Sequence, residues 1–150
     1  MRRWFPLGAL LTVLLLAIHG DGRAADRVVL GQDPQAMLHE IALQMNVRLR
    51  ADVPPPAIYL ESRTPLAQFQ DALETQWGFR PPRFANAYAA ARNEIYLIDD
   101  ASYYRRMKRT LDESLAHELA HYVQVRYFNA DLSDPSSEID AVAVQQRFRR

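Results

Sequence analysis

The sequence predicts an α+β fold in which a small sheet packs on helices. Apolar residues that recur every three or four positions indicate amphipathic helices, and short alternating runs indicate strands. Asp-Pro and Thr-Pro pairs are typical of helix beginnings, and prolines separate several of the runs. The expected order is helix, two strands, helix, two strands, two helices. At 150 residues with 49% hydrophobic residues, the chain can form one domain with a real core.

The first 25 residues are predicted to be a signal peptide, which leaves residues 26–150 as a single domain. Two arginines follow the initial methionine, and residues 7–18 form an apolar run of 12 residues. Small residues then offer cleavage after Ala24 or Ala25. Twelve apolar residues are too few for a stable transmembrane anchor, so we expect an exported protein, periplasmic or secreted. An uncleaved N-terminal anchor is the alternative.

The composition excludes some partners and some means of stabilisation. The chain has 18 Lys and Arg and 18 Asp and Glu; removing residues 1–25 takes away three arginines and one aspartate, leaving a net charge of −2. Without a positive field or a basic stripe, nucleic acid is not an expected partner. The chain has no cysteine, so an exported form cannot use disulfides and depends on its apolar core, with a metal as an added constraint.

Four elements are expected in the first half of the domain. They are a helix over 34–46, strands over 47–50 and 57–60, and a helix over 65–76. Asp33 caps the first helix, and Thr64 is the expected N-cap of the second, each followed by a proline at the first helical position. Gly78 ends the second helix.

The second half begins with an expected hairpin and ends with two helices. The hairpin covers 86–98 with its turn at Arg92-Asn93, residues 102–108 are either a short helix or a loop, and the helices cover 112–128 and 134–149. In the second strand, Ile95 and Leu97 should face one way and Tyr96 and Ile98 the other. An apolar residue recurs every fourth position from Leu111 to Tyr127, which favours one long helix there.

His117-Glu118-Leu119-Ala120-His121 spells H-E-x-x-H within that helix. Residues four apart project from the same helix face, so two neutral imidazoles can share one tetrahedral Zn²⁺. The intervening Glu118 can reach a water at the metal and act as a general base. With four histidines in the chain, chance predicts only about 0.005 such motifs.

A catalytic zinc usually has three protein ligands, so a third is needed. His39 lies far from the motif and is expected to be a surface or core histidine. The extended three-histidine pattern fails, because Gln124 stands at its glycine position and Tyr127 at its third histidine. These departures leave a downstream carboxylate as the third ligand.

Glu138 is the preferred third ligand, 17 residues after His121 and one turn into the last helix. The intervening segment is long enough to end one helix and bring the next back against it. Asp140, Asp131 and Asp134 remain alternative ligands.

The H-E-x-x-H motif followed by Glu138-x-x-Ala141 resembles the gluzincin branch of zinc metallopeptidases in a minimal form, over roughly residues 84–148. The resemblance implies a zincin-like domain whose C-terminal helix carries the third ligand. It also implies Zn²⁺ bound by His117, His121 and Glu138. Glu118 would be the catalytic base of a zinc metalloendopeptidase that hydrolyses peptide bonds.

The same resemblance implies a substrate site and exposes one departure. In that family an extended peptide pairs with the strand before the motif helix, so a peptide or protein substrate is expected along the edge strand 94–98. Some gluzincins place an aspartate that orients a histidine ligand where this chain has Val142. The partners of the two histidines therefore stay unassigned.

Three questions remain open from the sequence. Tyr88 and Tyr96 are either oxyanion donors or strand aromatics. The chain is either a peptidase or a non-catalytic zinc-binding interaction or structural protein. The motif could also be accidental in a metal-free interaction domain.

Overall fold

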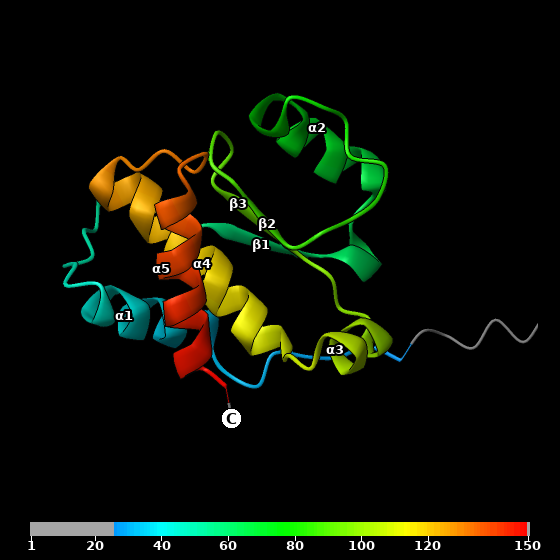
Figure 1. The fold of residues 1–150 in the computed structure, drawn as a ribbon, viewed down its shortest axis with the longest axis horizontal. Helices are drawn as coiled ribbons and strands as arrows, with labels where there is room; N and C mark the ends of the chain where they lie inside the picture. Colours follow the sequence, from blue (N-terminus) through cyan, green and yellow to red (C-terminus); the bar gives the residue numbers. More distant parts are fainter. Residues whose placement is uncertain (1–25, 150) are drawn as a thin grey trace, which may run out of the picture.

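A computed structural model describes residues 26–149, and the predicted signal peptide at 1–25 lies outside the described residues. The elements are α1 (Pro34–Gln44), β1 (Ala57–Leu60), the 3₁₀ helix η1 (Glu61–Arg63), α2 (Leu66–Trp77), β2 (Ala87–Ala89), β3 (Glu94–Leu97), α3 (Ala101–Met107), α4 (Leu111–Phe128) and α5 (Pro135–Arg147). This mixture of helices and one small sheet confirms the α+β prediction (Figure 1). Within the described residues, no helix is long and apolar enough to cross a membrane.

The sheet has the strand order β1-β3-β2, so β3 is the central strand. It pairs in parallel with β1 and antiparallel with β2. The prediction that 94–98 is an edge strand is therefore wrong, because β3 is hydrogen-bonded on both sides and cannot accept a further strand. The hairpin itself is confirmed, with Asn93 at φ 55° in its turn. The free edge of the hairpin is β2.

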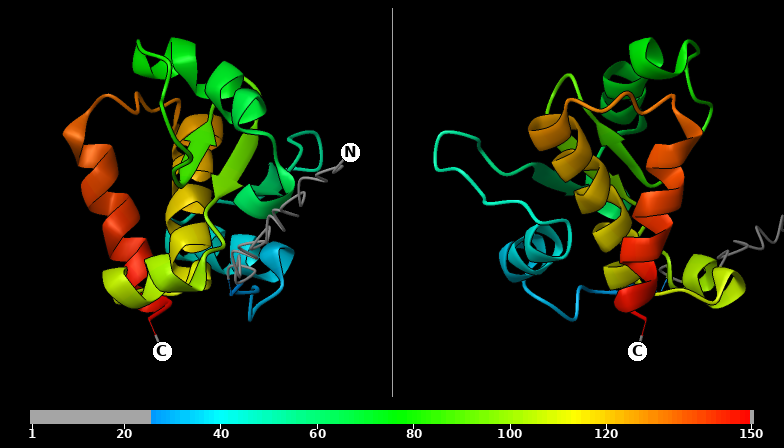
Figure 2. Two further views of the ribbon diagram at one scale, coloured as in Figure 1. Left: turned by 90° about the vertical axis from the view of Figure 1, so that its right-hand side faces the viewer. Right: turned by 60° about the vertical axis from the view of Figure 1, so that its left-hand side comes forward.

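The sheet is covered on both faces, with α2 on one and α4 on the other (Figures 1 and 2). Ile95 and Leu97 pack with α1 and α4, whereas Tyr96 packs with Phe69 and Leu73 of α2. The predicted alternation of β3 is thus confirmed. It separates two apolar clusters, and the cluster against α4 supports the helix that carries the H-E-x-x-H motif.

Helix ends follow local side-chain chemistry in most places. The carboxylates of Asp33 and Asp134 accept the backbone N–H of Ala36 and Ser136, as N-caps do. The predicted cap at Thr64 is wrong, because its hydroxyl donates to the carbonyl of Leu60 and α2 begins after Pro65 without a side-chain cap.

Two uncertain segments are decided by the structure. Residues 101–107 form the short helix α3. The strand predicted over 47–50 is wrong: the segment is irregular, and the N–H of Val47 returns to the carbonyl of Ala42 at the end of α1. The N–H of Arg50 donates to the Tyr127 hydroxyl rather than to the carbonyl of a neighbouring strand. The alternation of Val47 to Arg50 reflects packing of a loop on the core rather than pairing.

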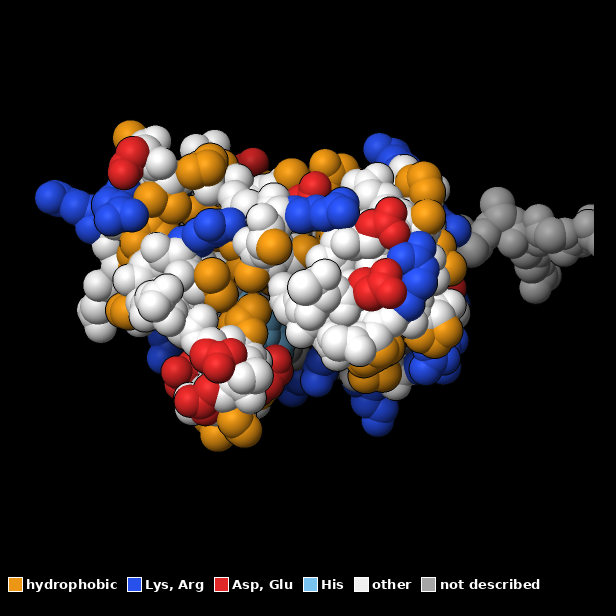
Figure 3. Space-filling model, turned by 90° about the horizontal axis from the view of Figure 1, so that it is seen from above, with side chains coloured by type: hydrophobic (Ala, Val, Ile, Leu, Met, Phe, Trp, Pro, Cys, Tyr) orange, Lys and Arg blue, Asp and Glu red, His pale blue; other side chains and the backbone are white. Residues whose placement is uncertain are grey.

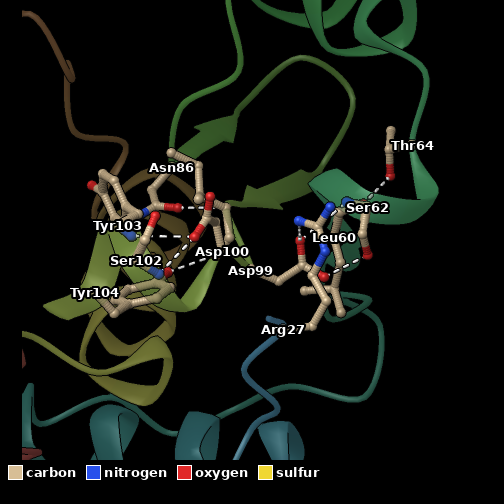
Figure 4. A network of polar contacts seen from close by, with 11 residues as sticks. Arg27, Leu60, Ser62, Thr64, Asn86, Asp99, Asp100, Ser102, Tyr103 and Tyr104 are labelled. Carbon is tan, nitrogen blue, oxygen red and sulfur yellow. Dashed lines mark hydrogen bonds and ion pairs between the residues drawn. The ribbon is translucent and has the colours of Figure 1, made fainter. Parts of the chain in front are cut away.

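The segment that leads into α1 is tied to the end of β3 by two adjacent aspartates (Figure 4). Asp99 is 2% exposed and accepts both the N–H and the hydroxyl of Ser62, and it pairs with Arg27 at 3.3 Å. Asp100 caps α3 by accepting the N–H of Ser102. These contacts join the first described residues to the sheet and α3.

Candidate metal centre

The long helix α4 presents the motif histidines to α5, which runs back beside it (Figure 1). His121 is buried and His117 partly buried. Glu138 lies in the first turn of α5 and is exposed. Ala141, one turn later, is fully buried, and its small side chain permits close packing of α5 on the core.

Three side chains from the two helices converge on one point. The Nε2 atoms of His117 and His121 are 3.1 Å apart. The carboxylate of Glu138 lies 3.1 Å from Nε2 of His121 and 3.3 Å from Nε2 of His117. The structure thus brings together the three residues that the sequence nominated, and this group could hold a metal ion.

The other acidic candidates lie elsewhere or are already engaged. The carboxylate of Asp131 accepts the N–H of Ser133. Asp134 is occupied as the N-cap of α5. Asp140 is exposed and lines a separate hollow beside the end of α1. Among the described residues, only Glu138 joins the two histidines in a potential metal-binding group.

The second ring nitrogen of each histidine meets a glutamine that sequence reasoning missed. Nδ1 of His121 lies 2.8 Å from Oε1 of Gln124, and Nδ1 of His117 lies 3.1 Å from Oε1 of Gln145. Gln124 and Gln145 are both almost completely buried. The positions of both glutamines in the sequence could have indicated these contacts. Gln124 follows His121 by three residues, and Gln145 follows Glu138 by two helical turns, so each shares a helix face with a candidate ligand.

The surroundings of His117 favour its neutral form. Burial is the largest influence and lowers the pKa of His117, and the neighbouring His121 lowers it further. Glu138 and the hydrogen bond to Gln145 act in the opposite direction. A neutral imidazole is the form that can bind a metal ion.

Glu118 lines the same cleft but points to the β2 side of α4. It is 6% exposed, and burial raises its pKa to about 8, with a further increase from the charge of Glu138. The backbone N–H of Tyr88 opposes this rise by interacting with the carboxylate. A buried carboxyl with a strongly raised pKa beside a possible metal site is typical of an acid–base catalyst.

A cleft of about 620 Å³ borders these residues. It is lined by residues from α2, β2, α4, the 130–133 segment and the start of α5. Figure 3 shows histidine surface deep in a hollow, with acidic side chains on its rim. None of the lining residues, all of which belong to the described part, is Lys or Arg. The charged side chains that line the cleft are therefore acidic.

Along one wall of the cleft, a side-chain amide covers the free edge of β2. Nε2 of Gln76 donates to the carbonyl of Tyr88 at 2.9 Å, and its Oε1 accepts the N–H of Ala90 at 2.9 Å. An added strand would use the same carbonyl and N–H. The edge of β2 beside the candidate site is thus able to bind an amide.

The structure also answers the questions about the remaining aromatic and histidine candidates. Tyr96 lies in the apolar cluster on the α2 face, and its hydroxyl donates to Glu94. The hydroxyl of Tyr88 is bonded to Asn93 and Arg126. Both are fully buried strand aromatics, which argues against the oxyanion role. His39 is exposed on α1, as a surface histidine.

Comparison with known proteins finds no relative. No protein-family model, no curated protein and no solved structure matches this chain. Its chemistry has to be inferred from the geometry of its own site.

Proposed function

We propose that this chain is a minimal zincin-like, zinc-dependent metallopeptidase that hydrolyses peptide bonds after export through its predicted signal peptide. One observation carries the proposal. Two histidines and a glutamate meet with their ligand atoms 3.1–3.3 Å apart, and the buried Glu118 lines the same cleft.

The choice of zinc is supported by the donor set and its spacing. Bonds of 2.0–2.1 Å in a tetrahedron place neighbouring ligand atoms about 3.3 Å apart. The three distances between His117, His121 and Glu138 are close to that value. Two imidazoles and one carboxylate are also a common ligand set for catalytic zinc.

The chemistry of hydrolysis divides between the ion and Glu118. When bound, zinc would polarise the scissile carbonyl and make the attacking water more acidic. Glu118 would take a proton from that water and deliver it to the leaving amine. Its place in the same cleft, next to the two histidines, suits both steps.

The substrate backbone would add to β2 rather than to β3. β2 is an edge strand of the sheet and lines the cleft through Ala87 and Tyr88. The amide of Gln76 already makes the two hydrogen bonds that a peptide would make there. An extended peptide along β2 would pass Glu118 on the neighbouring helix.

The test combines metal content with hydrolysis. Wild-type protein should bind close to one zinc per chain and cleave members of a broad peptide library. Glu118→Gln should retain zinc and lose hydrolysis, whereas His121→Ala and Glu138→Ala should lose zinc as well. Full activity of Glu118→Gln, or no zinc in the wild type, would overturn the proposal. N-terminal sequencing of the exported protein should find a start at Ala25 or Asp26.

A non-catalytic zinc protein remains the second candidate, and one observation favours it. The residues that line the cleft include no arginine or lysine, and the hydroxyl of Tyr88 is engaged elsewhere. The cleft thus offers no cationic side chain to stabilise an oxyanion, and the Tyr88 hydroxyl does not serve as a donor there. Zinc binding without cleavage of any library peptide would support this candidate.

A further inference from the structure

We propose that Gln124 and Gln145 are positioning residues for the metal site. Each holds one histidine in the tautomer that leaves Nε2 free for the ion, and together they fasten α4 to α5. The inference rests on the proposed metal site, but it concerns contacts that exist before any ion binds.

The amide of Gln124 can be oriented in only one way. Its Nε2 lies 2.9 Å from the carbonyl of Ser137, which can only accept a hydrogen bond. Its other end, Oε1, must therefore be the atom that faces Nδ1 of His121 at 2.8 Å. An amide oxygen only accepts, so Nδ1 carries the proton. In the neutral ring, Nε2 of His121 then keeps its lone pair directed at Glu138.

Gln145 takes the matching position beside the other histidine, from the opposite helix. Its Oε1 lies 3.1 Å from Nδ1 of His117, and its side chain is 2% exposed. When Nδ1 donates, Nε2 of His117 keeps its lone pair. It then faces two further acceptors, Nε2 of His121 and the carboxylate of Glu138. Three acceptor atoms at this separation repel one another unless a cation lies among them.

Each glutamine lies on one of the two helices and contacts the other helix. Gln124 on α4 holds the backbone of Ser137, the residue before Glu138. Gln145 on α5 holds His117 on α4. The third ligand and the first are thus each fixed from the other helix. Because amides are uncharged, they supply this orientation without adding negative charge to the site, unlike an aspartate at the position of Val142.

The first test uses Gln145, with its exposed neighbour Gln146 as the matched control. Gln145→Leu should weaken zinc binding about 10- to 100-fold in a chelator competition assay. Gln145→Glu keeps an acceptor for Nδ1 and should restore most of the affinity, and Gln146→Leu should bind as wild type. Unchanged affinity in Gln145→Leu would overturn the role of this residue.

The second test measures the tautomer directly, in metal-free protein. Imidazole ¹H–¹⁵N correlation spectra should show the proton on Nδ1 of both His117 and His121. Gln124→Glu keeps the acceptor but cannot donate to Ser137, whereas Gln124→Met keeps neither contact. His121 should retain the Nδ1–H tautomer in the first variant and lose it in the second. An unchanged tautomer in Gln124→Met, or an Nε2–H tautomer in wild type, would overturn the inference.

Failure of this inference can be told from failure of the proposed function. Absence of zinc from wild type contradicts the proposed function, while the tautomers of the metal-free protein still decide the role of the glutamines. Normal zinc binding with freely exchanging tautomers contradicts the inference alone. If Gln124→Met does not unfold cooperatively in urea, the Gln145 variants decide the question.

Discussion

Glu118 is held where a carboxylate is poorly solvated, between α4 and the backbone of β2. Burial raises its pKa, the charge of Glu138 adds to the rise, and the N–H of Tyr88 only partly offsets it. The same helix carries His117, whose pKa is shifted the other way by burial. Both shifts favour uncharged side chains in the metal-free protein, and this has a measurable consequence for stability.

The stability of the metal-free protein should fall as the pH rises from 4.5 to about 8 because of Glu118. The pKa of its carboxyl is raised from 4.5 to about 8 on folding, so over that range the folded state binds more protons than the unfolded state. The free energy of unfolding then decreases with pH, by about 5 kcal/mol in total from this group. Urea titrations in the presence of a chelator would measure the decrease.

Glu118→Gln is the control for that pH dependence. The amide does not titrate, so the variant should lose this part of the slope and exceed wild type in stability at pH 8. Equal slopes in the two proteins would contradict the assignment of the raised pKa to Glu118.

A side chain of α2 occupies backbone hydrogen-bonding groups at the edge of β2, and so controls whether another strand can pair there. Gln76 is exposed, yet its amide takes the Tyr88 carbonyl and the Ala90 N–H. Each such hydrogen bond is worth only about 0.5–1.5 kcal/mol net, so a substrate peptide could displace the side chain. On the proposed function, the amide would compete with a substrate peptide for the same two backbone groups.

Gln76→Ala should lower KM for a cleaved library peptide by about 3- to 10-fold, because one competing hydrogen-bonding group is removed. Hydrogen exchange at the Ala90 amide should become faster, which checks the contact without relying on activity. Thr75→Ala, on the exposed surface of the same helix, is the control. A rise in KM would instead mean that Gln76 binds the substrate.

The N-terminal cap of α4 allows a test of how the beginning of this helix is stabilised. Thr110 accepts the N–H of Glu113, and Glu113 accepts the N–H of Thr110, which forms a capping box. Thr110→Ala should reduce the free energy of unfolding by about 1 kcal/mol in urea denaturation. Thr110→Ser keeps the hydroxyl and should be close to wild type; equal losses in both variants would contradict the capping role.

Across the domain, the candidate metal site joins two helices that also pack through apolar residues and through the two glutamines. α4 and α5 pack through residues such as Ala120 and Ala141, and the ligands lie at the end where the 130–133 segment connects them. An ion that binds only the folded arrangement stabilises it by mass action. Metal binding should therefore be visible in the unfolding of the whole domain.

Zinc at 100 times its Kd should add about 2.7 kcal/mol to the free energy of unfolding. For a domain of this size, that corresponds to a rise in Tm of about 10 °C, which differential scanning calorimetry would detect. His121→Ala should show no such rise. An equal rise in wild type and in this variant would place the bound zinc elsewhere.

Local patterns were enough to predict most helices and the motif. The 3.6-residue period of α4, the caps at Asp33 and Asp134 and the alternation of β3 depend on neighbours within a few residues, so they can be read from the chain. Local patterns failed at 47–50. Alternation there predicted a strand, but a strand also needs a partner, and none lies beside that segment.

The sequence alone therefore determined the two histidines, the nearby Glu118 and the helices that carry them, because helix geometry places residues four apart on one face. It also favoured Glu138 as the third ligand, with Asp140, Asp131 and Asp134 as alternatives. Tertiary packing decided the rest: Glu138 as the acid that meets the histidines, Gln124 and Gln145 as their partners, and β2 rather than β3 as the free edge. These outcomes depend on how α5 and the strands pack, through contacts between residues far apart in the chain. A periodic pattern of neighbouring residues carries no information about such contacts.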